Sequence, residues 1–186
     1  MTTPATGPRT VYYTATSLDG FIATPDHSLD WLLSREADND NGPMAMTEFM
    51  AGVGAIVMGA NTYQWLLDNE AAQPWPYEVP TWVCTHREFA PRTDGDVRFT
   101  QDPIELVHKS MTEAAAGRNR WVVGGGELAG QFADRGLLDE VIVSIAPVTL
   151  GAGAPLLPRR LELRVDEVAG NGEFACVRYT VVAPNG

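Results

Sequence analysis

A short strand pattern passes directly into a helix pattern at Val122-Val123-Gly124-Gly125-Gly126-Glu127-Leu128. The three glycines let the backbone turn tightly and let a ligand approach it, and a helix that begins here presents free N–H groups. Such a junction is a good phosphate site, and a tight turn without a ligand explains it equally well. It does not match the GxGxxG fingerprint, because Ala129 occupies the last glycine position, and it lacks the Lys-Ser/Thr of a P-loop.

Two further junctions follow the same plan. The apolar run Ala55 to Met58 leads into Gly59-Ala60-Asn61-Thr62-Tyr63, where Asn61 or Thr62 is predicted to cap a helix. The strand pattern 81–85 leads into Thr85-His86-Arg87, where Arg87 either holds a further phosphate or is a solvated surface arginine. Because parallel strands end at one edge of a sheet, helix N-termini at neighbouring strands suit a ligand with two phosphate groups.

The order of elements indicates an α/β protein. Strand and helix patterns alternate to about residue 140, and a helix over 103–116 is predicted to have Asp102 as its N-cap and Pro103 as its first residue. Strand patterns alone follow, with a hairpin signal at Asn171-Gly172. We expect a single three-layer α/β/α domain over residues 10–183, after a disordered leader at residues 1–9. Its central sheet should be mainly parallel, with antiparallel C-terminal edge strands.

Charge and composition exclude several classes of protein. The 186 residues carry 13 Lys and Arg against 24 Asp and Glu, a net charge of −11, which argues against nucleic acid and anionic membranes as partners. Cys84 and Cys176 lie in no metal-binding pattern, so no metal site is predicted and two buried thiols are expected. The sequence has neither a signal peptide nor an apolar run of membrane-spanning length, so we expect a cytoplasmic protein.

An ordered set of motifs identifies the family that this sequence resembles. They are Thr16-Ser17-Leu18-Asp19-Gly20-Phe21-Ile22-Ala23, Ser28-Leu29-Asp30-Trp31, Met58 to Tyr63, Val122 to Gly126, Leu137-Leu138-Asp139-Glu140 and Pro147-Val148-Thr149-Leu150-Gly151-Ala152-Gly153. The sequence resembles the dihydrofolate reductase-like superfamily, in the branch similar to the C-terminal reductase domain of bacterial bifunctional riboflavin-biosynthesis deaminase/reductase proteins. The HxE…PCxxC zinc set of the deaminase half does not occur in the sequence.

The resemblance implies a reductase that uses NADPH, with NADH as the alternative. Motif matching places Ala15 and Ile22 beside the nicotinamide, and Thr85, His86 and Arg87 beside the adenosine ribose. The pyrophosphate would contact Gly59, Asn61 and Thr62 on one side and Gly124, Gly125, Gly126, Glu127 and Leu128 on the other. The family often has a cis bond at the position of Gly124-Gly125. Ala60 and Glu127 stand where dihydrofolate reductases carry basic side chains, so only His86 and Arg87 remain for a 2′-phosphate.

The substrate would be a small heterocycle or imine that accepts hydride. Asp30 is the candidate residue to orient the substrate or relay a proton. Trp31 and Phe49 are expected to form the wall of the substrate pocket, and Ser144 is expected to contact the substrate. Each of these residues has an alternative structural role. Asp30 could be a capping or surface acid, Trp31 and Phe49 could be core aromatics, and Ser144 could be a strand hydroxyl bonded to the backbone. The activity of this branch is reduction of 5-amino-6-(5-phosphoribosylamino)uracil in riboflavin biosynthesis. That substrate carries a phosphate, yet residues 24–50 contain only one Arg or Lys, Arg35.

Two further expectations concern alternatives and assembly. A dinucleotide-binding module without catalysis is the competing function, and consumption of hydride with an acceptor distinguishes the two. The C-terminal strands beyond Val141 are apolar and long for a sheet edge. Unpaired edges of this kind are commonly covered by association, so we expect a homodimer.

Overall fold

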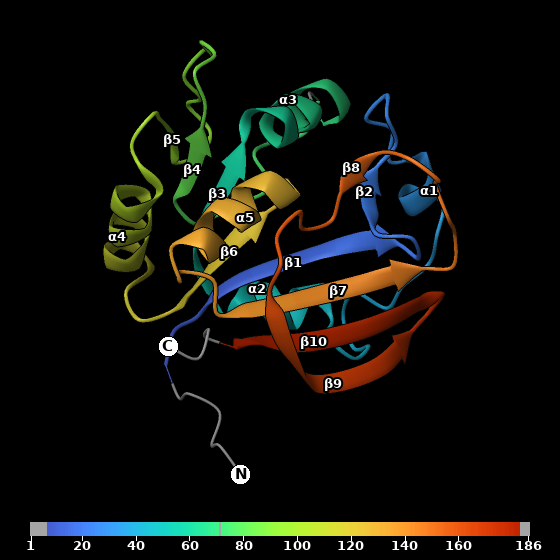
Figure 1. Ribbon diagram of the computed structural model, residues 1–186. Helices are drawn as coiled ribbons and strands as arrows, with labels where there is room; N and C mark the ends of the chain where they lie inside the picture. The colour runs from blue at the N-terminus through green and yellow to red at the C-terminus, as the bar shows by residue number, and fades with distance from the viewer. Residues whose placement is uncertain (1–6, 71, 183–186) are drawn as a thin grey trace.

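The computed structural model describes residues 7–70 and 72–182. These residues form ten strands and five helices (Figure 1). The strands are β1 (Thr10–Ser17), β2 (Phe21–Ala23), β3 (Val53–Gly59), β4 (Thr81–Cys84), β5 (Val97–Thr100), β6 (Asn119–Val123), β7 (Glu140–Ala146), β8 (Ala154–Pro155), β9 (Glu162–Asn171) and β10 (Phe174–Val182). The helices are α1 (Asp30–Leu33), α2 (Met46–Ala51), α3 (Ala60–Asn69), α4 (Ile104–Ala115) and α5 (Gly126–Asp134). Strands and helices are interspersed up to β7 and strands alone follow, as the sequence predicts, whereas α1 and β8 were not predicted.

Eight strands form the central sheet in the order β5-β4-β3-β6-β1-β7-β10-β9. The first six of these strands are parallel, whereas β10 is antiparallel to β7 and β9 is antiparallel to β10. The predicted parallel sheet with antiparallel C-terminal edge strands is therefore confirmed. The sequence did not reveal the small second sheet, in which β2 pairs with β8.

Two apolar clusters cover the two faces of the sheet. On one face α4 and α5 pack against strand residues such as Val57 and Val122, and on the other α1, α2 and α3 pack against residues such as Ile56 and Trp121. Neighbouring residues of β3 and β6 enter opposite clusters, because successive side chains of a strand point to opposite faces. The buried, unbroken apolar runs thus produce the three-layer α/β/α arrangement.

Two predicted helix starts are wrong by one or more residues. The N-cap of α3 is Gly59, and neither Asn61 nor Thr62 caps it, because the extended Gly59 lets the helix begin directly after β3. The N-cap of α4 is Pro103 rather than Asp102, and the helix starts at Ile104. Proline suits this place because its missing N–H would have no partner in the first turn.

The ends of the described chain bear on two sequence predictions. Most of the predicted leader, residues 1–6, lies outside the described residues. Arg9, its last residue, pairs with Glu140, and its backbone N–H donates to Asn119 Oδ1 at 2.8 Å. Among the described residues, no helix is long and apolar enough to cross a membrane.

Candidate functional site

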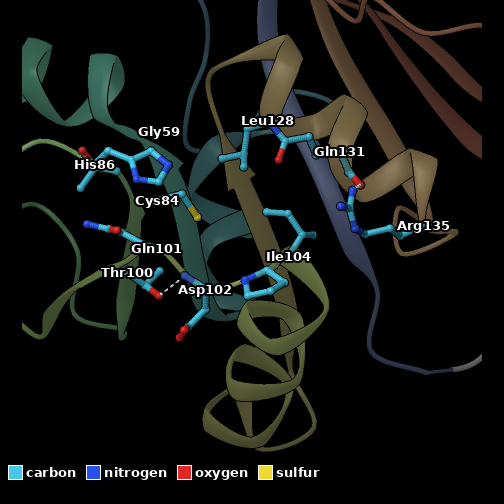
Figure 2. A pocket seen from close by; sticks show the side chains of 12 residues that line it. Gly59, Cys84, His86, Thr100, Gln101, Asp102, Ile104, Leu128, Gln131 and Arg135 are labelled. Atoms are coloured by element: carbon cyan, nitrogen blue, oxygen red, sulfur yellow. Dashed lines mark hydrogen bonds between the residues drawn. The ribbon is translucent and has the colours of Figure 1, made fainter.

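The larger cavity, pocket 1, has a volume of about 370 Å³ and lies where β3, β4 and β5 end (Figure 2). Gly59 pairs with Cys84 and Cys84 with Thr100, so the residues that follow these strands meet along one edge of the sheet. The starts of α3 and α4 and one side of α5 complete the cavity. Its lining residues are Gly59, Cys84, Thr85, His86, Thr100, Gln101, Asp102, Pro103, Ile104, Leu128, Gln131 and Arg135.

The two glycine junctions predicted from the sequence face one another. Met58 of β3 pairs with Val123 of β6, so Gly59 and Gly124 leave the sheet side by side. A Cβ atom on Gly124 would lie 2.6 Å from Thr62 Oγ1, a distance that real Cβ atoms do not adopt. Gly124 therefore lets the Thr62 side chain of α3 pack directly against the turn from β6 into α5, which brings the starts of α3 and α5 together as the two sides of a pyrophosphate cradle require.

Gly124 and Gly125 have φ angles of +59° and +72°. The described peptide bonds are all trans, so the cis bond expected at Gly124-Gly125 is not found. The turn from β6 into α5 is instead made by two successive residues in the left-handed region, which glycine adopts without steric cost.

The negative charge of Glu127 is offset by Arg159, a neighbour that the sequence does not suggest. Arg159 donates to both Glu127 oxygens, at 2.7 and 3.1 Å, and to Asp134 Oδ2 at 2.9 Å. These hydrogen bonds lower the pKa of Glu127, so the carboxylate is ionised and paired. Glu127 therefore presents a shielded charge to the glycine junction rather than a bare one.

Arg87, the proposed phosphate ligand, is held in place by both junctions that it adjoins. Its Nη2 donates to Asn61 Oδ1 at 2.8 Å, and its backbone N–H donates to Thr85 Oγ1 at 2.8 Å. His86 lines pocket 1 directly. The structure thus brings together Asn61, Thr85, His86 and Arg87, which the sequence analysis assigned to one cofactor.

Sequence reasoning missed the far wall of pocket 1. Gln101 and Asp102 follow β5, and Gln131 and Arg135 extend along α5 and just past its end. One signal was present: Leu128, Gln131 and Arg135 recur at i, i+3 and i+7, the spacing that places residues on one helix face. Arg135 is oriented by Glu105, which accepts from its Nε at 2.7 Å.

The thiol in pocket 1 has no nucleophilic character. Burial, with a smaller effect of the Asp102 charge, raises the pKa of Cys84 to about 11, so it is a neutral thiol at neutral pH. Both cysteines are free, and Cys176 is buried. Within the described residues, no three His, Cys, Asp or Glu side chains gather as a metal site would require.

A smaller cavity, pocket 2, has a volume of about 150 Å³ and lies over β1, β7 and β10. Ala15, Ser144 and Cys176 form a row across these strands, because Ala15 pairs with Ser144 and Ser144 with Cys176. The expected nicotinamide neighbour Ala15 and the expected substrate contact Ser144 therefore share one cavity. Its lining residues are Tyr13, Thr14, Ala15, Leu32, Ala37, Asn39, Met46, Ser144, Asn171, Phe174 and Cys176.

The remaining candidate residues do not line pocket 2. Phe49 packs edge-on against Tyr13 and Trp121, with ring centroids 4.9 and 5.4 Å apart, so it supports the pocket from behind. Trp31 packs half-buried against the same apolar cluster. Asp30 is exposed at the first position of α1, and its role as a proton relay stays a prediction. Ile22 lies half-buried in the short strand β2.

Asn171, at the end of β9, holds the outer wall of pocket 2 in place. Its Oδ1 accepts from Asp38 N–H at 2.8 Å, and its Nδ2 donates to the carbonyl oxygens of Asp38 and Pro43 at 3.0 and 3.2 Å. This side chain is only 6% exposed. The wall segment between α1 and α2 has no regular structure of its own, so these three bonds fix it against the hairpin.

Comparison with known proteins supports the same architecture. The model of the RibD C-terminal domain family matches residues 8–172. The uncharacterized protein YwjB of Bacillus subtilis (strain 168) is 30% identical over 174 residues, which cover 92% of this chain and 97% of that protein.

Solved structures give a consistent result. A protein assigned to riboflavin biosynthesis from Shewanella sp. PV-4 superposes with a TM-score of 0.78 at 27% identity, covering 94% of this chain and 99% of that one. A diaminohydroxyphosphoribosylaminopyrimidine deaminase/5-amino-6-(5-phosphoribosylamino)uracil reductase from Thermotoga maritima superposes with a TM-score of 0.67 at 15% identity. That match covers 95% of this chain and 57% of the longer protein, and it bears on the fold alone.

Proposed function

The chain belongs to the RibD C-terminal domain family, and on that premise we propose that it is an NADPH-dependent reductase of a small nitrogen-containing heterocycle. The main observation in support of this proposal is the arrangement of the two pockets along the sheet. In the strand order β5-β4-β3-β6-β1-β7-β10, the glycine junctions after β3 and β6 separate pocket 1 from pocket 2. An extended dinucleotide laid across this edge would reach from one cavity to the other over both helix N-termini.

The residues present fit such a cofactor. The adenosine half would occupy pocket 1, with the His86 ring and the neighbouring Arg87 guanidinium available to a 2′-phosphate and Arg135 as a further cation. The pyrophosphate would lie between the start of α3 at Gly59 and the backbone of the Gly124-Gly125 turn that leads into α5. When bound, the nicotinamide supplies a hydride, and proximity to a substrate held in pocket 2 accounts for most of the rate acceleration.

Pocket 2 contributes neutral hydrogen-bonding groups. The hydroxyl of Tyr13 donates to the carbonyl oxygen of Met44 at 2.6 Å, and burial raises the pKa of Tyr13, so this residue stays protonated. Ser144 Oγ and Cys176 Sγ lie 3.5 Å apart. These groups can orient a ring, and Tyr13, with its raised pKa, is a poor proton donor. We therefore propose that the proton reaches the substrate through water, with Asp30 as the candidate relay at the protein surface.

Titration of the purified protein with NADPH and with NADH, followed by tryptophan quenching, tests the cofactor. We expect Arg87→Ala to weaken NADPH about tenfold or more, because charge-assisted hydrogen bonds to a phosphate are lost, and to leave NADH unchanged. The matched control is Arg164→Ala, because Arg164 lies on β9 at the opposite end of the sheet. Equal weakening of both cofactors, or no binding of either by the wild type, would contradict the proposal.

Consumption of NADPH in the presence of an acceptor distinguishes the reductase from the competing function, a dinucleotide-binding module without catalysis. The reductase predicts turnover with a nitrogen heterocycle. The module predicts that NADPH binds with the same dependence on Arg87 and is never oxidised.

A further inference from the structure

Pocket 2 is lined without any charged side chain. Tyr13, Thr14, Asn39, Ser144 and Asn171 supply its polar groups, and the rest of the lining that the structure describes is apolar or a thiol. A phosphate carried into this cavity would lose its hydration with no cation to replace it, which is among the most costly changes in protein energetics. The cavity therefore suits the uncharged part of a substrate.

The volume of pocket 2 fixes how much of a substrate it can hold. Cavities of about 150 Å³ accept a single six-membered ring, and pocket 2 has this volume. A sugar chain and its phosphate would consequently lie outside it, against the residues at its mouth. The charge of the mouth then decides whether a phosphorylated substrate is tolerated.

The segment beside the mouth is acidic in sequence. Its residues Ala37 and Asn39 line the pocket, and they alternate along the chain with the exposed residues Glu36, Asp38 and Asp40. Hydrogen bonds from the backbone N–H groups of Asn41 and Asp40 hold the pKa of Asp38 below its usual range, so this carboxylate is ionised at neutral pH. The three carboxylates of this segment give it a negative charge, which disfavours a phosphate group in its vicinity.

Two arginines on elements that adjoin this region, Arg35 and Arg178, are engaged in ion pairs. Arg35, the only arginine or lysine between residues 24 and 50, donates from Nη1 to Glu173 Oε1 at 3.3 Å and from Nε to the Trp31 carbonyl at 3.0 Å. Arg178, two positions along β10 from Cys176, donates to Glu140 at 2.8 Å and to Glu167 at 3.3 Å. Neither is left to neutralise a phosphate at the mouth.

From this neutral cavity and acidic mouth we infer that the substrate is a phosphate-free nitrogen heterocycle, either uncharged or cationic. This inference rests on the proposed reductase function and narrows its substrate class. It departs from the activity that the Thermotoga maritima protein is named for, whose substrate bears a phosphoribosyl group. The family fold is shared, but the residues around this cavity favour a different acceptor.

A matched pair of ring compounds tests the inference. Calorimetric titration would compare 5-amino-6-(5-phosphoribosylamino)uracil with the same compound after phosphatase treatment, with and without NADP⁺. We expect the dephosphorylated compound to bind about tenfold more tightly or better, and the difference to shrink as ionic strength rises. Tighter binding of the phosphorylated compound would overturn the inference.

A variant of the lining supplies the reverse test. Asn39 is exposed at the mouth, and it contributes its backbone carbonyl to Thr47 N–H at 2.9 Å, a bond that a substitution of the side chain preserves. Asn39→Arg should raise the affinity for the phosphorylated compound about tenfold while leaving NADPH binding in pocket 1 unchanged. Asn39→Gln is the uncharged control, and it should keep the wild-type preference for the dephosphorylated compound.

The outcomes separate the two proposals. If the protein binds NADPH but neither ring compound, the substrate class is wrong and the cofactor assignment stands. If it fails to bind NADPH, the reductase function is wrong, while the comparison of the two ring compounds without NADP⁺ still measures what pocket 2 prefers.

Discussion

Gly124 is subject to two separate constraints. Its φ of +59° lies in the left-handed region, and the space that a Cβ atom would need is taken by Thr62. Gly136, which follows α5, has a φ of +65° with no atom within 4 Å of its would-be Cβ. The pair therefore separates left-handed backbone strain from loss of the close contact between Gly124 and Thr62.

We expect Gly136→Ala to cost about 1–2 kcal/mol of folding stability, from left-handed strain alone, and to leave NADPH affinity unchanged. Gly124→Ala should cost more, because Thr62 must also move, and it should weaken NADPH binding strongly. Thermal unfolding and tryptophan quenching measure the two effects. Normal NADPH affinity in Gly124→Ala would remove the assignment of this junction to the pyrophosphate.

At the scale of elements, Asp19 joins two motifs that are far apart in the chain. The turn between β1 and β2 presents its carboxylate, which accepts from Ser17 Oγ at 2.6 Å and from the N–H groups of Leu150 and Gly151 at 3.0 and 2.7 Å. The pairing of β2 with β8 continues the same contact. The motifs at residues 16–23 and 147–153 therefore hold each other in place, and we interpret most of their residues as structural.

The hydrogen bonds to Asp19, that from Ser17 above all, lower its pKa from 3.8 to about 2. A pKa lowered by folding stabilises the folded state above pH 3.8, and this contribution is lost as the pH falls towards 2. We expect Asp19→Asn to be less stable than the wild type at neutral pH, and the difference to shrink over that acidic range. Denaturant unfolding at a series of pH values measures it.

Asp68→Asn is the matched control for this titration. Asp68 is exposed on α3 and accepts one hydrogen bond, from Gln64, with no link between distant elements. Its substitution should leave the pH dependence of stability close to that of the wild type. A constant stability difference between Asp19→Asn and the wild type from neutral pH to pH 2 would contradict the role given to Asp19.

At the scale of the whole molecule, the edge strand β9 presents an apolar face. Val168, Val165 and Leu163 lie opposite Val177, Tyr179 and Val181 of β10, and β9 and β10 extend away from α4 and α5 (Figure 1). Val168 is 67% exposed and Val165 55% exposed. We propose that a second copy of the chain covers this face, because a two-fold dimer would bury the same apolar residues on both partners.

Val168→Asp should convert the proposed dimer to a monomer in sedimentation, because it would place a charge in the middle of an apolar interface. Leu106→Asp is the matched control, since Leu106 is 53% exposed on α4, at a different part of the surface. A wild-type protein that sediments as a monomer at micromolar concentration would show that the face is not a dimer interface.

The sequence by itself determined the order of the main-sheet strands and their helices, the parallel sheet with its antiparallel edge and the positions of the glycine junctions, but not α1 or β8. These follow from short-range patterns: an apolar run followed by glycine specifies a strand end, and Asn171-Gly172 specifies a hairpin turn. Two helix starts were predicted wrongly, because Gly59 and Pro103 are the N-caps and neither helix has a hydrogen bond from a capping side chain.

Only the tertiary structure decided how the site is assembled. It pairs Glu127 with Arg159, adds Gln131 and Arg135 to pocket 1, and turns the hairpin residue Asn171 into the support of the wall of pocket 2. A local pattern describes relations across a few residues, whereas each of these contacts joins groups on separate elements. A cavity and its charge are set by which distant side chains meet, and packing of the whole chain decides that.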